Sequence, residues 1–225
     1  MLYRTLPGIL MLALALPVWA QNVVVDEGTF RIFEHGQDVG TETFAIRWVG
    51  QGEDTHIIAN AVIELELPGG HQQVKPLLRG GSDLSLSAYQ VEVSGIDATE
   101  VTVILGGRRF LTRTRSPSGE LEREFRATPG AVVLDNGVAH QYWFLSRLAE
   151  GTEVTALVPR AGAQRLIQVR ESILESVEVA DVQVQSRHVT LTIEGHSHEV
   201  WYDAEGRVLK VLVADSGFTA ERTSQ

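Results

Sequence analysis

The stretch Val182-Gln-Val-Gln-Ser-Arg-His-Val-Thr-Leu-Thr-Ile193 alternates apolar and polar residues with a period of two over its second half. Val189, Leu191 and Ile193 lie on one face of an extended chain, and the threonines between them lie on the other. Alternation of this kind is typical of a β-strand that buries one face. The stretch therefore predicts one strand of an antiparallel sheet.

The same alternation recurs along most of the chain. Strand-like runs occupy residues 30–32, 44–48, 54–67, 84–93, 100–105, 154–158, 164–169 and 182–193. Short strands separated by Gly-bearing turns are typical of antiparallel all-β folds. No linker rich in Pro, Ser or Gly interrupts the pattern. We therefore expect one β-rich domain over residues 21–225, folded as a single large curved antiparallel sheet or half-barrel.

The Arg-rich segment between residues 108 and 126 can be placed in register. It contains six Arg. With residues 116–119 as the turn, the facing pairs are Arg115–Glu120, Arg113–Glu122 and Phe110–Phe125. This register predicts an exposed charge ladder with an apolar opposite face. Binding of a phosphate or an anionic lipid headgroup is the alternative, because the segment keeps a net positive charge.

A hairpin is also expected near the start of the domain. Phe30 and Ile32 precede the segment 35–39, and Phe44 and Ile46 follow it. If residues 35–39 form the loop, Phe30 pairs with Phe44 and the apolar residues of both strands share one face.

One segment, residues 134–149, departs from the strand pattern. Asp135 and Asn136 offer N-cap side chains, and apolar residues recur at helical spacing at Val138, Tyr142, Leu145 and Ala149. We expect a helix over about 137–149 that packs against the sheet. Its residues Tyr142, Trp143 and Phe144 are either ordinary core or the lining of a hydrophobic cavity, and they are the candidate ligand-binding residues.

Residues 1–20 have the composition of an export signal. Arg4 gives a positive start and Leu6–Leu16 is largely apolar. Val18 and Ala20 suit the positions that signal peptidase reads, so we expect cleavage after Ala20. The apolar run is shorter than the ~20 residues that cross a bilayer. No Cys is present to carry a lipid anchor, so we expect a periplasmic or secreted protein with no membrane span after cleavage.

Composition excludes several classes of function. The formal net charge is -10, which argues against nucleic acid as a partner. The chain has no Cys, so an exported protein of this sequence has no disulfides. Thiol nucleophiles, thiolate metal sites and iron–sulfur clusters are excluded for the same reason.

Few residues suggest chemistry. The H-E-x-x-H, Walker and G-x-G-x-x-G motifs are absent. His196 and His198 would project from one face of a strand and could bind a metal with His188 or His56, although the interpretation we favour is a polar strand end beside a turn. Ser197 lacks the Gly and the following helix of a nucleophile elbow. We expect no catalytic residue, no metal site and no cofactor.

Segments near both ends of the domain resemble hairpins of exported bacterial domains of unknown function. The closing pattern W-x-D-x-x-G-x-V-x-K is carried by Trp201, Asp203, Gly206 and Lys210. Gly36 and Gly40 carry the G-x-x-x-G spacing of the opening hairpin, and residues 134–142 extend the resemblance. The resemblance implies a large curved antiparallel sheet in the periplasm. It also implies a likeness to lipoprotein-carrier half-barrels, which hold acyl chains in their concave face, and it transfers no catalytic residues.

Three functions remain open at this point. The first is an exported, non-enzymatic periplasmic domain that binds a lipid or another apolar ligand between sheet and helix. The second is a protein-interaction or envelope-assembly module that uses a sheet edge or the acidic surface to bind an envelope protein. The third is a hydrolase or metal-dependent enzyme. The oligomeric state is not readable, because no heptad or repeat marks an interface.

Overall fold

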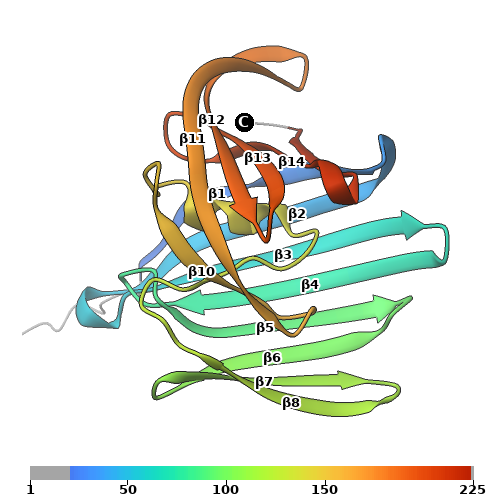
Figure 1. The fold of residues 1–225 in the computed structure, drawn as a ribbon, viewed down its shortest axis with the longest axis vertical. Helices are drawn as coiled ribbons and strands as arrows, with labels where there is room; N and C mark the ends of the chain where they lie inside the picture. The colour runs from blue at the N-terminus through green and yellow to red at the C-terminus, as the bar shows by residue number, and fades with distance from the viewer. Residues whose placement is uncertain (1–20, 224–225) are drawn as a thin grey trace, which may run out of the picture.

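The computed structural model describes residues 21–223, and a single sheet dominates them (Figure 1). The expected export signal, residues 1–20, lies outside the described residues. The strands are β1 (Gln21–Glu34), β2 (Gln37–Gly50), β3 (His56–Leu67), β4 (Gly70–Gly80), β5 (Leu86–Gly95), β6 (Thr99–Gly106), β7 (Arg109–Ser116), β8 (Gly119–Arg126), β9 (Val132–Val133), β10 (Glu153–Val158), β11 (Ala163–Val179), β12 (Val182–Ile193), β13 (His196–Tyr202), β14 (Val208–Val213) and β15 (Phe218–Arg222). Three short 3-10 helices are η1 (Gly52–Asp54), η2 (Ala139–Leu145) and η3 (Ala214–Ser216).

The strand order explains the shape of the molecule. The sheet runs β8-β7-β6-β5-β4-β3-β2-β1-β15-β14-β13-β12-β11-β10-β9, and only the β9–β10 pair is parallel. The first and last strands therefore lie side by side in the middle of the sheet. We call strands β1–β8 the first arm and strands β9–β15 the second arm. The mainly β fold with a single large antiparallel sheet is confirmed.

The sheet curls until its far ends meet. Arg123 Nη1 of β8 donates to Gly162 O at 2.6 Å, and Gln164 Nε2 of β11 donates to Arg126 O at 2.8 Å. Inward-facing residues of both arms and of η2 form one hydrophobic core between them, and Figure 1 shows η2 enclosed in this way. In β12, Val189, Leu191 and Ile193 are buried in this core, as their alternation predicts.

The predicted register of the Arg-rich hairpin is confirmed. β7 and β8 pair as Arg115–Glu120, Arg113–Glu122 and Phe110–Phe125. Arg113 Nη2 lies 2.8 Å from Glu122 Oε1, and Arg115 Nε lies 2.9 Å from Glu120 Oε2. All four charged side chains are about half exposed or more. The ladder thus lies on the outer face of the sheet, away from the core.

The predicted register of the opening hairpin is wrong. The turn between β1 and β2 contains only His35 and Gly36, and Phe30 pairs with Glu42 rather than with Phe44. The difference comes from the turn, which is shorter than residues 35–39. An irregularity between Ile32 and Phe33 shifts the pairing by one residue in the direction of the predicted register. Phe30 and Phe44 still stack, with ring centroids 5.1 Å apart, because diagonal neighbours share a face.

The expected helix is present but is shorter and of a different type. η2 is a 3-10 helix over Ala139–Leu145, whereas the spacing predicts an α-helix over about 137–149. Six of its seven residues are buried, so the segment has no exposed face for an amphipathic helix to turn toward water. Its side-chain cap also differs, because Asp135 does not cap the helix and Glu42 of β2 binds its first N–H groups instead.

The sheet contains a central strand that the alternation did not predict. β4 includes Pro76, which lies opposite Val91 of β5. Proline removes a backbone donor and usually argues against a central strand.

Among residues 21–223, no helix has the length and apolar character needed to cross a membrane.

Candidate ligand cavity

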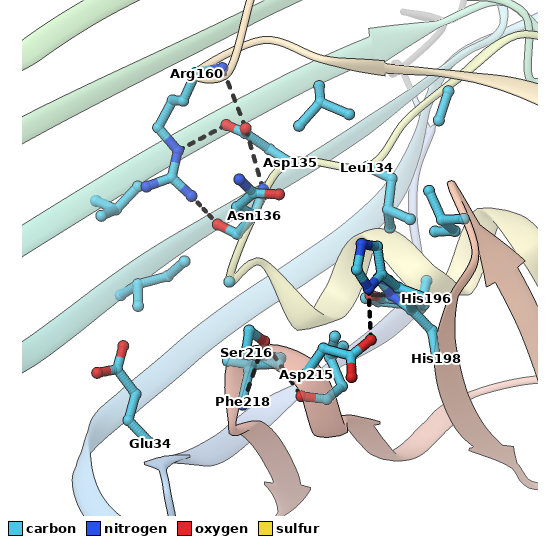
Figure 2. A pocket seen from close by; sticks show the side chains of 18 of the residues that line it. Glu34, Leu134, Asp135, Asn136, Arg160, His196, His198, Asp215, Ser216 and Phe218 are labelled. Atoms are coloured by element: carbon cyan, nitrogen blue, oxygen red, sulfur yellow. Dashed lines mark hydrogen bonds and ion pairs between the residues drawn. The ribbon is translucent and has the colours of Figure 1, made fainter. Parts of the chain in front are cut away.

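A cavity of about 460 Å³ opens where hairpin ends of the two arms converge (Figure 2). It is lined by Glu34, Ile63, Leu65, Leu67, Gln72, Val74, Leu134, Asp135, Asn136, Gly137, Tyr142, Ala156, Val158, Arg160, Arg165, Ile193, His196, His198, Val213, Asp215, Ser216 and Phe218. These residues belong to segments that are far apart in sequence. The curl of the sheet is what brings them together.

The walls of the cavity are largely apolar. The first arm contributes Ile63, Leu65, Leu67 and Val74 from β3 and β4. The second arm contributes Ala156, Val158, Ile193, Val213 and Phe218. Their inward orientation follows from strand alternation, since Val62 between Ala61 and Ile63 points to the outer face and is exposed.

A buried carboxylate holds the segment that forms one end of the cavity. Glu42 Oε2 accepts from Ala139 N at 2.7 Å, and Glu42 Oε1 accepts from His140 N at 2.9 Å. His140 Nδ1 lies 2.6 Å from the same Oε1, and both side chains are fully buried. These contacts fix η2 against β2, and η2 in turn carries Tyr142 into the cavity lining.

A second polar network fixes the loop before η2. Asp135 accepts from the Tyr89 hydroxyl at 3.1 Å and from Arg160 Nε at 2.9 Å. Arg160 also donates to Asn136 O, and Figure 2 shows these contacts at one side of the cavity. Desolvation by burial raises the pKa of Tyr89 well above its usual value, so this hydroxyl stays a donor. The network ties β5, the loop before η2 and the β10–β11 turn into one rigid wall.

His198 contacts the only η2 side chain that lines the cavity. Its Nδ1 lies 2.6 Å from the Tyr142 hydroxyl. Burial lowers the pKa of His198 to about 4, with smaller contributions from His196 and Arg165. Burial also raises the pKa of Tyr142. At neutral pH the phenol therefore donates to Nδ1 of a neutral imidazole, which leaves the proton of His198 on Nε2.

Charged groups surround the rest of the cavity. His196 Nδ1 lies 2.5 Å from Asp215 Oδ2. Arg165 Nε lies 3.2 Å from Glu194 Oε2, but this buried nitrogen forms no hydrogen bond. Glu34 lies at the end of β1, and Figure 2 shows it on the opposite side of the cavity from Arg160.

The three predicted ligand-binding residues do not all line the cavity. Tyr142 lines the cavity, whereas Trp143 and Phe144 do not. Trp143 is buried and packs edge-to-face on Phe144 with ring centroids 5.1 Å apart, so this pair contributes to the core. A ligand role for Tyr142 stays a prediction. Glu34, Arg160, Arg165 and Asp215 were not predicted, because only the strand order reveals that their hairpin ends meet.

The histidines considered as metal ligands lie on different faces. His188 Nε2 lies 2.8 Å from Glu199 Oε2, on the face of β13 opposite His198. His56 Nδ1 contacts Asp54 O near η1. Within residues 21–223, no three His, Asp or Glu side chains are placed to hold a metal ion. Ser197 donates its hydroxyl to Glu199 rather than to a histidine.

Comparisons with known proteins give one structural neighbour to report. No protein-family model matches the chain, and no curated protein matches it. The chain is similar to the solved structure described as "Crystal Structure of Beta-barrel-like Protein of Domain of Unknown Function DUF1849 from Brucella abortus". The two share 9% sequence identity over 90% of this chain and 94% of that chain, with a TM-score of 0.47.

Proposed function

We propose that this protein is an exported, periplasmic, non-enzymatic binding protein that holds the apolar chain of a lipid-like ligand in the cavity between its two arms. The single observation that carries the proposal is the half-open cavity of about 460 Å³ with apolar walls and a few polar groups. Ligand pockets of proteins typically have volumes of about 300–1,000 Å³ and this mixture of side chains. An acyl chain matches the apolar walls in chemistry.

Two features of the sequence support the remaining parts of the proposal. Residues 1–20 have the charge, apolar run and small residues of an export signal. The opening and closing hairpins resemble those of exported domains, and through them the acyl-binding half-barrels of lipoprotein carriers. Both features agree with a ligand that belongs to the cell envelope.

The polar contacts in the cavity favour binding over catalysis. Asp135 is fully occupied by Tyr89, Arg160 and backbone N–H groups. His198 is engaged by Tyr142, and no serine hydroxyl contacts it among residues 21–223. Among residues 21–223, the hydroxyl that lies beside a histidine in this cavity is that of Tyr142, and burial raises its pKa and so disfavours its ionisation.

A neutral fluorescent probe tests the proposal. The probe is N-phenyl-1-naphthylamine, and the competitor is a monoacylglycerol with a palmitoyl chain. We expect saturable probe fluorescence with the wild-type protein and displacement by the competitor. Leu65→Trp fills the cavity from β3, so it should weaken binding at least tenfold.

Val62→Trp provides the matched control. Val62 lies on the same strand, but its side chain is exposed on the outer face. This variant should bind like the wild type. Absence of saturable binding to the wild type, or equal loss in both variants, would contradict the proposal.

One observation favours the protein-interaction module as a second candidate. The β11–β12 hairpin extends beyond the neighbouring strands, and Ile173, Leu174 and Val182 are exposed on it (Figure 1). The side chain of Leu174 is the most exposed of these, since the residue is 83% accessible. Cross-linking in a periplasmic extract should give an adduct that Leu174→Ser abolishes if this hairpin binds a partner. An adduct that persists in the variant would exclude the hairpin.

A further inference from the structure

We propose that the ligand of the cavity is a lipid with a zwitterionic phosphoethanolamine head, whose ammonium group lies at Glu34 and Asp215 and whose phosphate lies at Arg165. This inference rests on the proposed function, because it assigns the polar end of the ligand whose apolar chain fills the cavity. It is argued from the placement of charges around the cavity.

The acidic side of the cavity is built from two adjacent segments. Glu34 at the end of β1 pairs with Phe218 of β15, and the neighbouring His35 N donates to Gly217 O at 2.8 Å. This pairing brings the end of β1 beside η3, which carries Asp215. The Glu34 carboxylate has no hydrogen-bond or ion-pair partner among residues 21–223, and the residue lines the cavity. A carboxylate that lines a cavity without a cationic partner favours the binding of a cationic group of a ligand.

The basic side of the cavity lies on the β10–β11 hairpin. Arg160 is held by Asp135 and Asn136, so its guanidinium has a fixed orientation. Arg165 is less constrained, because its Nε is close to Glu194 but forms no hydrogen bond. A guanidinium with unused donors is well suited to bind phosphate oxygens. Figure 2 shows Arg160 and Glu34 on opposite sides of the cavity.

The balance of charge favours a head that carries both signs, although Asp135 already pairs with Arg160 and Asp215 with His196. The cavity lining contains two Arg and three acidic residues, which are Glu34, Asp135 and Asp215. A purely anionic head would lie close to the Glu34 carboxylate, and a purely cationic head would lie close to the Arg165 guanidinium. His198 contributes no positive charge at neutral pH, because burial lowers its pKa to about 4. A zwitterion satisfies both sides of the cavity at once.

Three probes that share a palmitoyl chain test this inference. They are lysophosphatidylethanolamine, lysophosphatidylglycerol and monopalmitoylglycerol, each titrated against the full mature chain below its micelle-forming concentration. The heads are zwitterionic, anionic and neutral. We expect the zwitterionic probe to bind about tenfold more tightly than either of the others, which corresponds to about 1.4 kcal/mol.

Variants assign the two charges separately. Glu34→Gln should remove the preference for lysophosphatidylethanolamine over lysophosphatidylglycerol, and Arg165→Gln should weaken both phospholipids while leaving monopalmitoylglycerol unchanged. Glu92→Gln and Arg79→Gln are the matched controls, because both residues are exposed on strands of the first arm and neither lines the cavity. If Glu34→Gln fails to fold by circular dichroism, Asp215→Asn takes its place with the same expectation.

The outcomes separate this inference from the proposed function. Equal affinity for all three probes would overturn the zwitterionic head while supporting an acyl-binding cavity. Tighter binding of lysophosphatidylglycerol would likewise overturn it. Failure of all three probes to bind would overturn the proposed function itself.

Discussion

At the scale of single residues, Glu42 connects the sheet to the segment that closes the cavity. Its carboxylate is fully buried and receives two backbone N–H groups of η2 and contacts the His140 ring. A sequence signal for this role exists, because Glu42 is in phase with Phe44 and Ile46, the apolar residues of β2. A carboxylate at an apolar position of an alternating strand indicates a buried polar contact.

Replacing Glu42 by Ala should lower the free energy of unfolding by about 3 kcal/mol, because buried donors of η2 lose their acceptor. Urea denaturation followed by circular dichroism measures the change. Glu92→Ala is the control, since this residue is exposed on β5. A loss of less than about 1 kcal/mol for Glu42→Ala would show that η2 is held by packing alone.

His198 predicts a pH dependence of stability. Burial lowers its pKa in the folded protein to about 4, from an ordinary value of 6.5. The unfolded chain therefore takes up a proton between pH 6.5 and 4 while the folded protein does not. Stability from this group is complete above pH 6.5 and declines as the pH falls toward 4.

The slope is at most about 1.4 kcal/mol per pH unit for one such group. Unfolding free energies at pH 7.5 and pH 5 give the measurement, and His198→Gln is the comparison. This variant should lose less stability than the wild type over that interval. Parallel pH profiles for the two proteins would contradict the buried neutral imidazole.

At the scale of elements, the opening hairpin contains two glycines with different constraints. Gly36 lies in the turn with a φ of +78°, and a Cβ there would meet nothing within 4 Å. Gly40 lies in β2 with a φ of +152°, and its Cβ would lie 1.9 Å from Glu64 O of the neighbouring strand. The same two residues form the G-x-x-x-G spacing of the sequence.

Gly36→Ala should therefore cost about 1 kcal/mol, which is the strain of a left-handed residue alone. Gly40→Ala should cost about 3 kcal/mol or more, because β2 and β3 must separate to admit the methyl group. Thermal or urea unfolding of the two variants gives the comparison. Similar losses in both would show that β2 adjusts its backbone at Gly40.

The charge ladder of β7 and β8 should contribute little to stability. Its side chains are about half exposed or more, and exposed pairs are typically worth about 0.2–1 kcal/mol. A double-mutant cycle with Arg113→Ala and Glu122→Ala should give a coupling energy in that range, and the coupling should decrease in 1 M salt. A coupling energy above about 2 kcal/mol would require desolvation of the ladder.

Elements were predictable from the sequence where local rules decide them. The β7–β8 register follows from the turn at residues 116–119 and from charges that face each other, so it was predicted correctly. Alternation predicted β12 equally well. The register of the opening hairpin was predicted wrongly because its turn contains only His35 and Gly36, whereas the prediction used a loop of residues 35–39. β4 was not predicted, because Pro76 argues against a strand in the interior of a sheet.

At the scale of the whole molecule, one buried ion pair joins the first and last strands. Arg222 Nη2 lies 2.6 Å from Asp26 Oδ1, and both side chains are almost fully buried. The same guanidinium donates to Glu27 O and Val208 O, so it connects β1, β14 and β15. This contact lies at the centre of the sheet, where the two arms join.

Arg222→Met should lower the free energy of unfolding by about 3–5 kcal/mol, because Asp26 then remains buried without a cation. The double variant Arg222→Met, Asp26→Leu should regain much of that loss. Denaturant unfolding of both proteins measures the effect. Equal stability of the single and double variants would show that water enters and solvates Asp26.

The cavity could be predicted only in part, for a reason that belongs to the whole molecule. Tyr142 was predicted as a candidate lining residue because a dense aromatic cluster in a β-sequence has to pack against the sheet. The charged residues that line it come from the ends of β1 and β11, from η3 and from the β10–β11 turn. No local pattern reveals that these ends meet, because the meeting depends on the strand order.

The central position of β15 also has a consequence for biosynthesis. β15 is synthesised after β1–β14, yet it lies between β1 and β14 in the sheet. A growing chain therefore cannot complete this sheet strand by strand, and the edge of β1 stays unpaired on that side until β15 has been made.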